Sequence, residues 1–289
     1  PWKQANDGTR LYLSTRNPIM KRNLQVLASA VLLSTASYSM AATVNIGGLD
    51  VNTGPIFSVA SIYENVVTAP GDTLAGFGEI TQINGVPISS LCSGCELTYQ
   101  FGGYTVTSLT SSDITFSGGW VNFYLGTGAT NDFNPFASAN SAADLAAATN
   151  GTLFMTLAGH PIDAAGNTFS GHGADIGTTA PVGFGAGLAD VDMSGTANGN
   201  TAGAGAIANA FFDTNGITAA NGGPADFQLG SSFSAQLLPH PEECPSGMEC
   251  VAGSADIRGV VGAVPEPQTY ALMLAGLGAI GFVARRRRS

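Results

Sequence analysis

The chain of 289 residues has 20 acidic and 10 basic side chains, and its formal net charge is −10. Nine of the basic residues lie before residue 42 or after residue 263, so residues 42–263 hold 18 acidic residues against the single base Arg258, a formal charge of −17. Such a body repels the phosphates of DNA and RNA, which excludes nucleic-acid binding, and it favours divalent cations or basic partners.

A secretory signal follows the first methionine of the chain, Met20. The basic pair Lys21–Arg22 precedes an apolar run over residues 24–33, and a small-x-small pattern ends at Ala41. A positive segment, an apolar segment and a site of small residues, in this order, are typical of a signal peptide. The sequence therefore predicts export by the secretion machinery, with a signal helix over residues 20–41 and cleavage after Ala41.

The signal and the tail described below divide the chain into four parts. We expect the segment before Met20 to be upstream sequence translated from a wrong start, because a signal peptide placed internally would be an unusual arrangement. A genuine N-terminal extension is the alternative. The predicted parts are the upstream segment at 1–19, the signal peptide at 20–41, a β-rich extracellular body at 42–263 and the tail at 264–289.

The body alternates short stretches of strand-forming residues with turns of Gly, Asn, Asp and Ser. Short, evenly spaced strands with few helical stretches favour an antiparallel β-sandwich. We therefore predict an all-β, sandwich-like body in which two strands form arms around a turn at residues 117–119. The predicted strands lie near residues 56–63, 74–83, 97–101, 104–107, 114–116, 120–125, 152–157, 226–229 and 233–237.

Two other stretches of the body differ in composition. Residues 137–149 are rich in helix formers and predict a short helix with Ser141 as its N-cap. Between Gly183 and Gly223 the chain shifts to Gly, Ala, Asn and Thr, which leaves few large side chains to bury. We predict an Ala/Gly/Asn-rich surface excursion there, with a short helix near residues 207–212.

The four cysteines form two close pairs, Cys92 with Cys95 and Cys244 with Cys250. Disulfides form and persist in the oxidising compartments that an exported chain meets, so we expect two short-loop disulfides. Cross-pairing between the two regions is the alternative. A four-thiolate zinc site fits less well, because five residues separate the second pair, more than is typical of such ligands.

Asp190 and Asp192 open a segment that is similar to a calcium-binding loop, with Gly195 at its sixth position. The twelfth position, where a bidentate glutamate belongs, is Thr201. We therefore assign no metal site and predict no cofactor, while calcium at these two weak candidates stays open.

Three other groups of residues are candidates for chemistry or binding. Ser170, His172 and Asp175 have the residue types of a nucleophilic triad, but no G-x-S-x-G elbow poses the serine. The adjacent carboxylates of residues 242–243 do not fix the separation that glycosidase chemistry needs. The aromatic residues at 120, 123 and 124 are candidates for a sugar-stacking platform, although an aromatic stripe in a strand is more often core. We therefore predict no catalytic residues and a protein that is not an enzyme.

The tail has three segments in order. Pro265 and Pro267 flank Glu266 in an extended, helix-resistant triplet. Residues 270–284 are apolar and uncharged, short for a membrane span but workable with their flanks, and predict a transmembrane helix. The cluster that follows would hold the C-terminus on the cytoplasmic side and consists of Arg285, Arg286, Arg287 and Arg288. On its physical pattern alone, the tail could equally be an ordinary C-terminal membrane anchor.

The three segments together resemble the PEP-CTERM sorting domain, which is also known as the ice-binding protein C-terminal domain. The resemblance implies a Gram-negative host whose exosortase recognises Pro265, Glu266 and Pro267. This enzyme would remove the tail at the inner membrane and leave the body at the cell surface or in the extracellular matrix. The ice-binding name transfers no activity to the body, which lacks a regular Thr-x-Thr array.

Proteins with this tail are often associated with exopolysaccharide, biofilm or floc formation. The resemblance therefore leads us to expect a structural or adhesive role for the body in such a matrix. An exopolysaccharide- or calcium-binding module is the first alternative, and a secreted hydrolase is the weaker one.

Overall fold

The computed structural model describes residues 43–52, 55–192, 203–234, 238–244 and 246–260, together with Leu277. The chain divides into two units, Pro1–Ala41 and Ala42–Ser289, and all described residues belong to the second. The predicted signal peptide, the triplet at 265–267 and the arginine cluster lie outside the described residues. Within the described part, no helix has the length and apolarity to cross a membrane.

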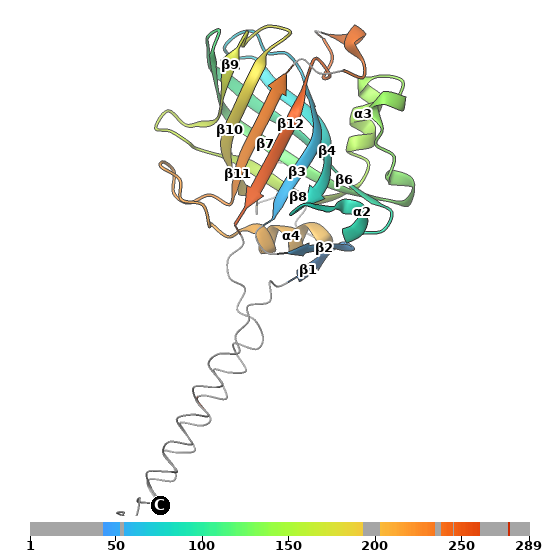
Figure 1. Ribbon diagram of the computed structural model, residues 1–289. Coiled ribbons are helices and arrows are strands. Elements are labelled where there is room, and N and C mark those ends of the chain that lie inside the picture. The colour runs from blue at the N-terminus through green and yellow to red at the C-terminus, as the bar shows by residue number, and fades with distance from the viewer. Residues whose placement is uncertain are drawn as a thin grey trace, which may run out of the picture. The chain divides into compact units, whose positions relative to one another are not determined.

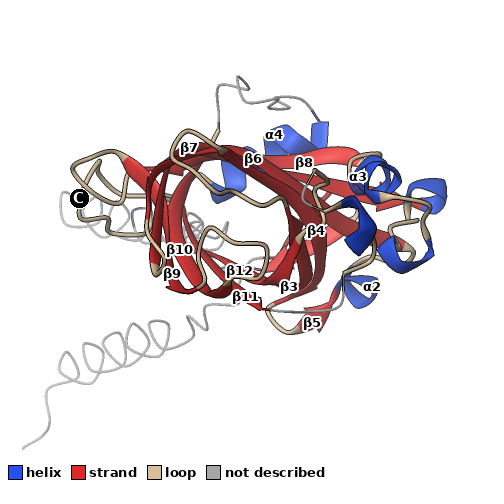
Figure 2. Cartoon of the chain, turned by 90° about the horizontal axis from the view of Figure 1, so that it is seen from above, coloured by secondary structure: helices blue, strands red, loops and turns tan. Residues whose placement is uncertain are grey.

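The body is an antiparallel β-sheet that closes on itself, as the view along its axis shows (Figure 2). Its closure comes from β11, which pairs with β12 on one side and with β10 on the other. The prediction of an all-β antiparallel body is confirmed, and its sheet forms a barrel. The barrel strands are β3 (Ile56–Glu64), β4 (Thr73–Ile83), β6 (Cys95–Leu109), β7 (Asp113–Thr127), β8 (Thr152–His160), β9 (Asn167–Ala174), β10 (Val182–Val191), β11 (Phe227–Ser234) and β12 (Val251–Gly259).

Two short strands, β8 and β9, share one position in the barrel wall. Strand β7 pairs with β9 over residues 113–117 and with β8 over residues 120–125. On the other side, β10 pairs with β9 over residues 182–187 and with β8 over residues 188–191. The short strand β5 (Val86–Pro87) pairs with β4 at the rim of the sheet.

Strands β6 and β7 are each 15 residues long, where the sequence predicted shorter strands separated by glycines. The predicted turn at residues 117–119 and the predicted break between the strands at 97–101 and 104–107 are both wrong, because each strand continues through its glycines. At Gly119, φ is 91° and an added Cβ would lie 2.2 Å from the Tyr104 ring. Glycine therefore supplies both the left-handed backbone and the space that the ring occupies.

Residues 182–191 form the barrel strand β10, so the predicted surface excursion does not begin at Gly183. The glycine-rich composition suggested a surface loop, but these glycines lie in a strand and make room for a ring from the neighbouring strand. A Cβ at Gly185 or at Gly187 would lie within 2.5 Å of the Phe169 ring. The large side chain that β10 lacks is thus supplied by β9. The Ala-rich helix is confirmed as α4 (Gly203–Phe212).

One end of the barrel is covered by α4 and by the hairpin of β1 (Thr43–Ile46) and β2 (Leu49–Asn52) (Figure 1). The centre of the core at this end is Phe57, which is fully buried. Its ring centroid lies 5.8–6.2 Å from those of Phe123, Phe212 and Phe227. Four elements, β3, β7, α4 and β11, therefore meet on one aromatic side chain.

A second helix, α3 (Ser141–Ala148), lies beside the barrel wall (Figure 1). Its N-cap is Asn140, whose side-chain oxygen accepts a hydrogen bond from Ala143 N at 2.9 Å, so the prediction of Ser141 as the cap is wrong by one residue. The shorter helices are α2 (Ile88–Leu91), η1 (Gly128–Thr130), η2 (Pro135–Ala137) and η3 (Pro241–Glu243). A second apolar cluster packs between α3 and the wall and contains Tyr63, Phe77, Ala148 and Ala252, with Phe133, Leu145, Leu238 and Met248 against them.

Candidate functional site

An apolar cavity of about 70 Å³ lies inside the barrel. Side chains from seven strands meet around it, and four of them are aromatic rings. An apolar, aromatic lining of this kind is typical of sites for largely apolar ligands, and the volume limits such a ligand to a very small molecule. The larger side chains of the lining are Ile62, Glu64, Leu74, Tyr99, Phe101, Tyr104, Val121, Phe169, Leu229 and Ile257.

A second cavity of about 60 Å³ adjoins the first. The two share Glu64, Leu74, Phe169 and Ser231 as lining residues, and the second extends to the loop that holds Ile176. The cavities thus form one internal space that runs from the middle of the barrel toward the loop after β9.

Glu64 is the single charged side chain in the lining of either cavity. Protein atoms surround it, while the cavity in front of it leaves the residue partly accessible. No described group hydrogen-bonds its carboxyl oxygens. Burial raises the pKa of Glu64 to about 8, because the apolar surroundings disfavour the charged form. A neutral carboxyl group thus faces an apolar space at neutral pH, where it can donate and accept hydrogen bonds.

The calcium candidates lie at the end of β10. His160 Nδ1 is 2.7 Å from Asp190 Oδ2, and His160 Nε2 is 3.1 Å from the backbone oxygens of Asn221 and Gly223. Burial lowers the pKa of His160, but the hydrogen bond and charge of Asp190 outweigh it and raise that pKa overall. One Asp190 oxygen is therefore committed to a histidine.

The structure describes only the first residues of the segment that resembles a calcium loop. Asp192 is buried, and its backbone oxygen accepts a hydrogen bond from Asn209 at 3.3 Å. Residues 193–202, which include Gly195 and Thr201, lie outside the described residues. Calcium at Asp190 and Asp192 stays a prediction.

The residues of the suggested triad do not form a hydrogen-bonded chain. Ser170 and His172 both lie on β9, and His172 Nδ1 bonds Asp113 Oδ1 at 2.7 Å rather than Asp175. Asp175 follows β9 in a turn with φ of 55°. The Ser170 hydroxyl donates to the backbone oxygen of Ala186 at 3.5 Å. The prediction that the chain is not an enzyme stays untested.

The three aromatic residues of the suggested sugar platform face different surroundings. Phe123 is fully buried in the barrel core, whereas Trp120 and Tyr124 are partly exposed. The Trp120 ring lies against Gly102 and Gly103 of the neighbouring strand, where an added Cβ would come within 2.9–3.1 Å of it. Because side chains alternate between the two faces of a strand, Phe123 does not share a surface with Trp120 and Tyr124.

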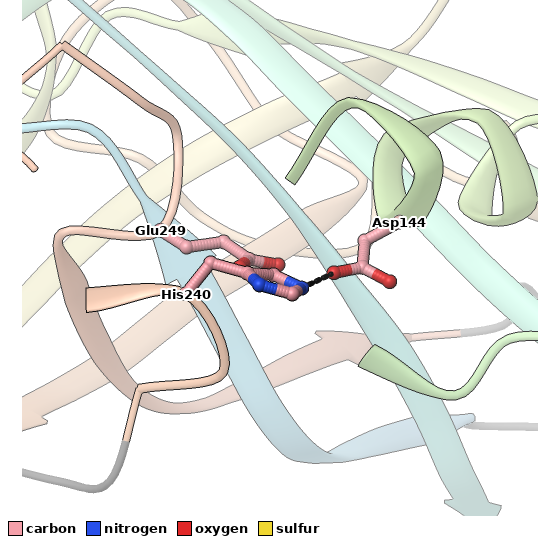
Figure 3. Close-up of side chains that lie close together, drawn as sticks. All are labelled: Asp144, His240 and Glu249. Carbon is pink, nitrogen blue, oxygen red and sulfur yellow. Dashed lines mark ion pairs between the residues drawn. The ribbon is translucent and has the colours of Figure 1, made fainter. Parts of the chain in front are cut away.

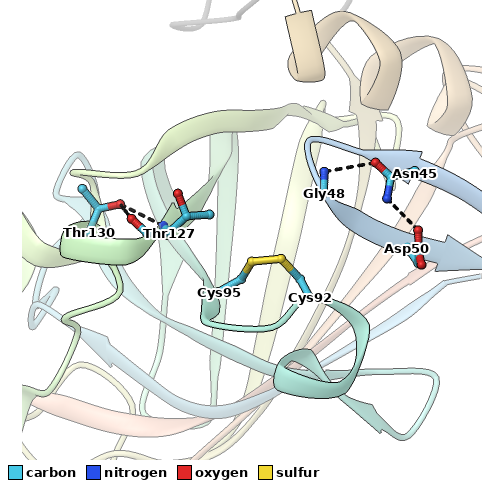
Figure 4. The surroundings of a disulfide bond; sticks show 7 residues. All are labelled: Asn45, Gly48, Asp50, Cys92, Cys95, Thr127 and Thr130. Carbon is cyan, nitrogen blue, oxygen red and sulfur yellow. Dashed lines mark hydrogen bonds between the residues drawn. A yellow bond between two sulfur atoms is a disulfide. The ribbon is translucent and has the colours of Figure 1, made fainter.

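The two cysteine pairs differ. Cys92 and Cys95 form a disulfide at the start of β6, near the β1–β2 hairpin (Figure 4). Cys244 and Cys250 are thiols in the structure. Burial, followed by a hydrogen bond with Cys244, raises the pKa of Cys250 to about 12. The first predicted disulfide is confirmed, and the second stays a prediction.

The carboxylates of residues 242–243 have different partners. Glu242 Oε1 lies 3.5 Å from His240 Nδ1, and Glu243 Oε2 accepts a hydrogen bond from Ser141 N at 3.3 Å. Sequence reasoning missed Glu64, although a carboxylate two residues from Ile62 in an apolar strand was a readable signal.

Comparison with known proteins identifies the tail. Residues 263–288 match the family model described as the PEP-CTERM protein-sorting motif. No curated protein and no solved structure matches the chain significantly. The predicted sorting tail is confirmed, while the body stays unassigned. The chain therefore carries a PEP-CTERM sorting motif, which marks it as an exported surface protein that an exosortase processes.

Proposed function

We propose that the exported body has a structural or adhesive role in an extracellular matrix, such as a biofilm, a floc or an exopolysaccharide layer. The observation that carries this proposal is the sorting motif at residues 263–288. The acidic body adds support, because a formal charge of −17 suits a hydrated matrix held together by divalent cations or basic partners. An exopolysaccharide- or calcium-binding module of the same matrix is the alternative.

Replacing Pro265, Glu266 and Pro267 with alanines is expected to keep the full-length chain in the inner membrane. The physical reason is that the exosortase loses its recognition triplet, while the apolar run and the arginines still hold the tail. Intact-mass spectrometry of membrane, surface and medium fractions measures this outcome. Gln268→Ala, next to the triplet, is the matched control and should be processed normally.

The matrix role has its own test. Deleting the gene is expected to reduce the mass of matrix or floc that the cells retain, and the wild-type chain should restore it. An unchanged matrix in the deletion strain would contradict the role. Normal export and processing of the chain in the parent strain would show that the sorting assignment still holds.

A second candidate function is favoured by the internal cavities: the barrel binds a small amphiphile. The apolar lining would take the body of such a molecule, and the neutral carboxyl of Glu64 would bond its one polar group. A ligand with a single amine or hydroxyl on an apolar body fits this arrangement, since a buried carboxyl without a partner is costly.

Benzyl alcohol, a small amphiphile with one hydroxyl group, is a suitable probe for the full chain, and calorimetry measures its affinity. Filling the cavity with Ala255→Leu is expected to lower its affinity about tenfold or more, the equivalent of about 1.4 kcal/mol. Phe184→Ala, on a side chain 59% exposed, is the control and should bind as the wild type does. Equal affinity in both variants would place the probe outside the barrel.

A further inference from the structure

Three side chains with metal-binding atoms meet between α3 and the segment before β12. Asp144 comes from α3, His240 precedes η3, and Glu249 precedes β12 (Figure 3). One donor atom from each lies within 4.8 Å of the others. The cluster is separate from the barrel interior and from the sorting tail, and it uses none of the residues that the sequence suggested for calcium.

The two carboxylates of this cluster are buried without hydrogen-bond donors. Asp144 and Glu249 are each 1% exposed, and His240 is 7% exposed. Among the described residues, no donor bonds any of the four carboxylate oxygens. His240 Nε2 lies 3.2 Å from Asp144 Oδ2, an ion-pair distance, and 3.0 Å from the Ser138 hydroxyl. Buried carboxylates need charged or hydrogen-bonding partners, and a single imidazole beside two of them leaves room for a cation as the common partner.

The surroundings offer no basic side chain to fill this role. The lone base of residues 42–263, Arg258, is exposed and lies 3.7 Å from Asp256 on the same strand. The other charged groups near the cluster are acidic, since Glu242 lies 3.5 Å from His240 and Glu243 bonds the start of α3. The local field therefore attracts a cation.

The ligand set selects the type of ion. An imidazole nitrogen with two carboxylates suits zinc and neighbouring transition ions, whereas calcium and magnesium prefer sites made of oxygen alone. A dication would also balance the two carboxylate charges. His240 faces Asp144 through Nε2 and Glu242 through Nδ1, which is the orientation of a metal-bound histidine held from behind by a carboxylate.

We propose that Asp144, His240 and Glu249 bind one divalent transition-metal ion, with Zn²⁺ as its representative, that fastens the segment 238–250 to α3. The ion would lie above the second apolar cluster, where Leu238 and Met248 of that segment pack near Leu145 of α3. A link between parts of the chain so far apart in sequence stabilises a fold by restricting the unfolded chain.

The test uses the full chain in detergent, freed of metal with a chelator and titrated with Zn²⁺, Mn²⁺ or Ca²⁺ separately. We expect one Zn²⁺ per chain by native mass spectrometry, tighter binding than for Ca²⁺ by calorimetry, and a Tm about 5–10 °C higher at a hundredfold excess over Kd. Asp144→Asn and Glu249→Gln are each expected to weaken zinc binding about 100-fold or more, beyond the usual loss for a residue behind a ligand.

Two controls separate this site from others. Asp256→Asn also removes one carboxylate, but on the outer face of β12, and should bind zinc as the wild type does. Cys244→Ser with Cys250→Ser removes the nearby thiols, which also bind zinc when reduced. Apo Asp144→Asn and Glu249→Gln should melt no lower than the apo wild type, because each removes a buried charge, so a lost zinc effect would not reflect unfolding.

Several results would overturn the proposal. Zinc binding that disappears with the thiols and persists without Asp144 would assign the ion to the cysteines. Absence of tight binding in the metal-free wild type would mean that the two carboxylates share a proton instead of a metal ion.

Discussion

Phe57→Ala is expected to lower the free energy of unfolding by about 4 kcal/mol, within the range of about 3–5 kcal/mol for a buried Phe. The reason is its place at one end of the barrel, where it is fully buried against Phe123, Phe212 and Phe227. These rings belong to three other elements, so the cavity left by alanine cannot close by the movement of a single strand. Urea denaturation at pH 7 measures the loss.

The matched variant for this comparison is Phe184→Ala, which removes the same atoms from a ring 59% exposed on β10. Its expected cost is about 0.5 kcal/mol or less. Equal losses at both positions would mean that the end of the barrel covered by α4 contributes little to stability, contrary to the packing described above.

Glu64→Gln is expected to stabilise the folded protein at pH 8 by about 2–4 kcal/mol and to leave its stability near pH 4 almost unchanged. The pKa of Glu64 is about 8 in the folded protein against an ordinary value of 4.5. The folded protein therefore keeps a proton that the unfolded chain has already released. The free energy of unfolding therefore has its highest value below pH 4.5 and decreases as the pH rises to about 8. Glutamine does not titrate, so the variant lacks this decrease. The expected gain stays below the full linkage value because the cavity admits water.

Urea denaturation of wild type and variant across pH 4–9 measures the difference between the two curves. Asp256→Asn serves as the control, because its side chain lies on the outer face of β12 and should leave the wild-type curve unchanged. Parallel curves for the wild type and Glu64→Gln would mean that Glu64 is solvated in the folded state, and the amphiphile site would lose its polar contact.

The strand content of the body was predictable because alternation and turn residues mark strands locally. The continuity of the strands was not. In β6, Tyr99 and Phe101 face the barrel interior and so does Tyr104, although its position has the opposite parity. The glycines at residues 102–103 change which positions of β6 face inward. In a sequence, such a break in alternation indicates the end of one strand and the start of another.

The candidate sites show the same limit. Phe57 and Glu64 both face the barrel interior, although one position is odd and the other even. The register shifts between Ser58 and Ser61 reverse the alternation of side chains between them. Alternation counted from either residue would place the other on the outer face. The cluster of Asp144, His240 and Glu249 is still less accessible to sequence reasoning, because Asp144 is far from the other two in the chain and only the tertiary fold brings it to them.

The position of Arg258 has a consequence for survival outside the cell. An extracellular protease that cleaves after lysine or arginine has one target in residues 42–263, and this target lies within β12. The backbone there is paired with β3 on one side and β11 on the other, so it cannot enter a protease cleft without opening the barrel. The processed body would therefore resist such enzymes for as long as it stays folded, and tryptic peptide mapping of a matrix would tend to miss it.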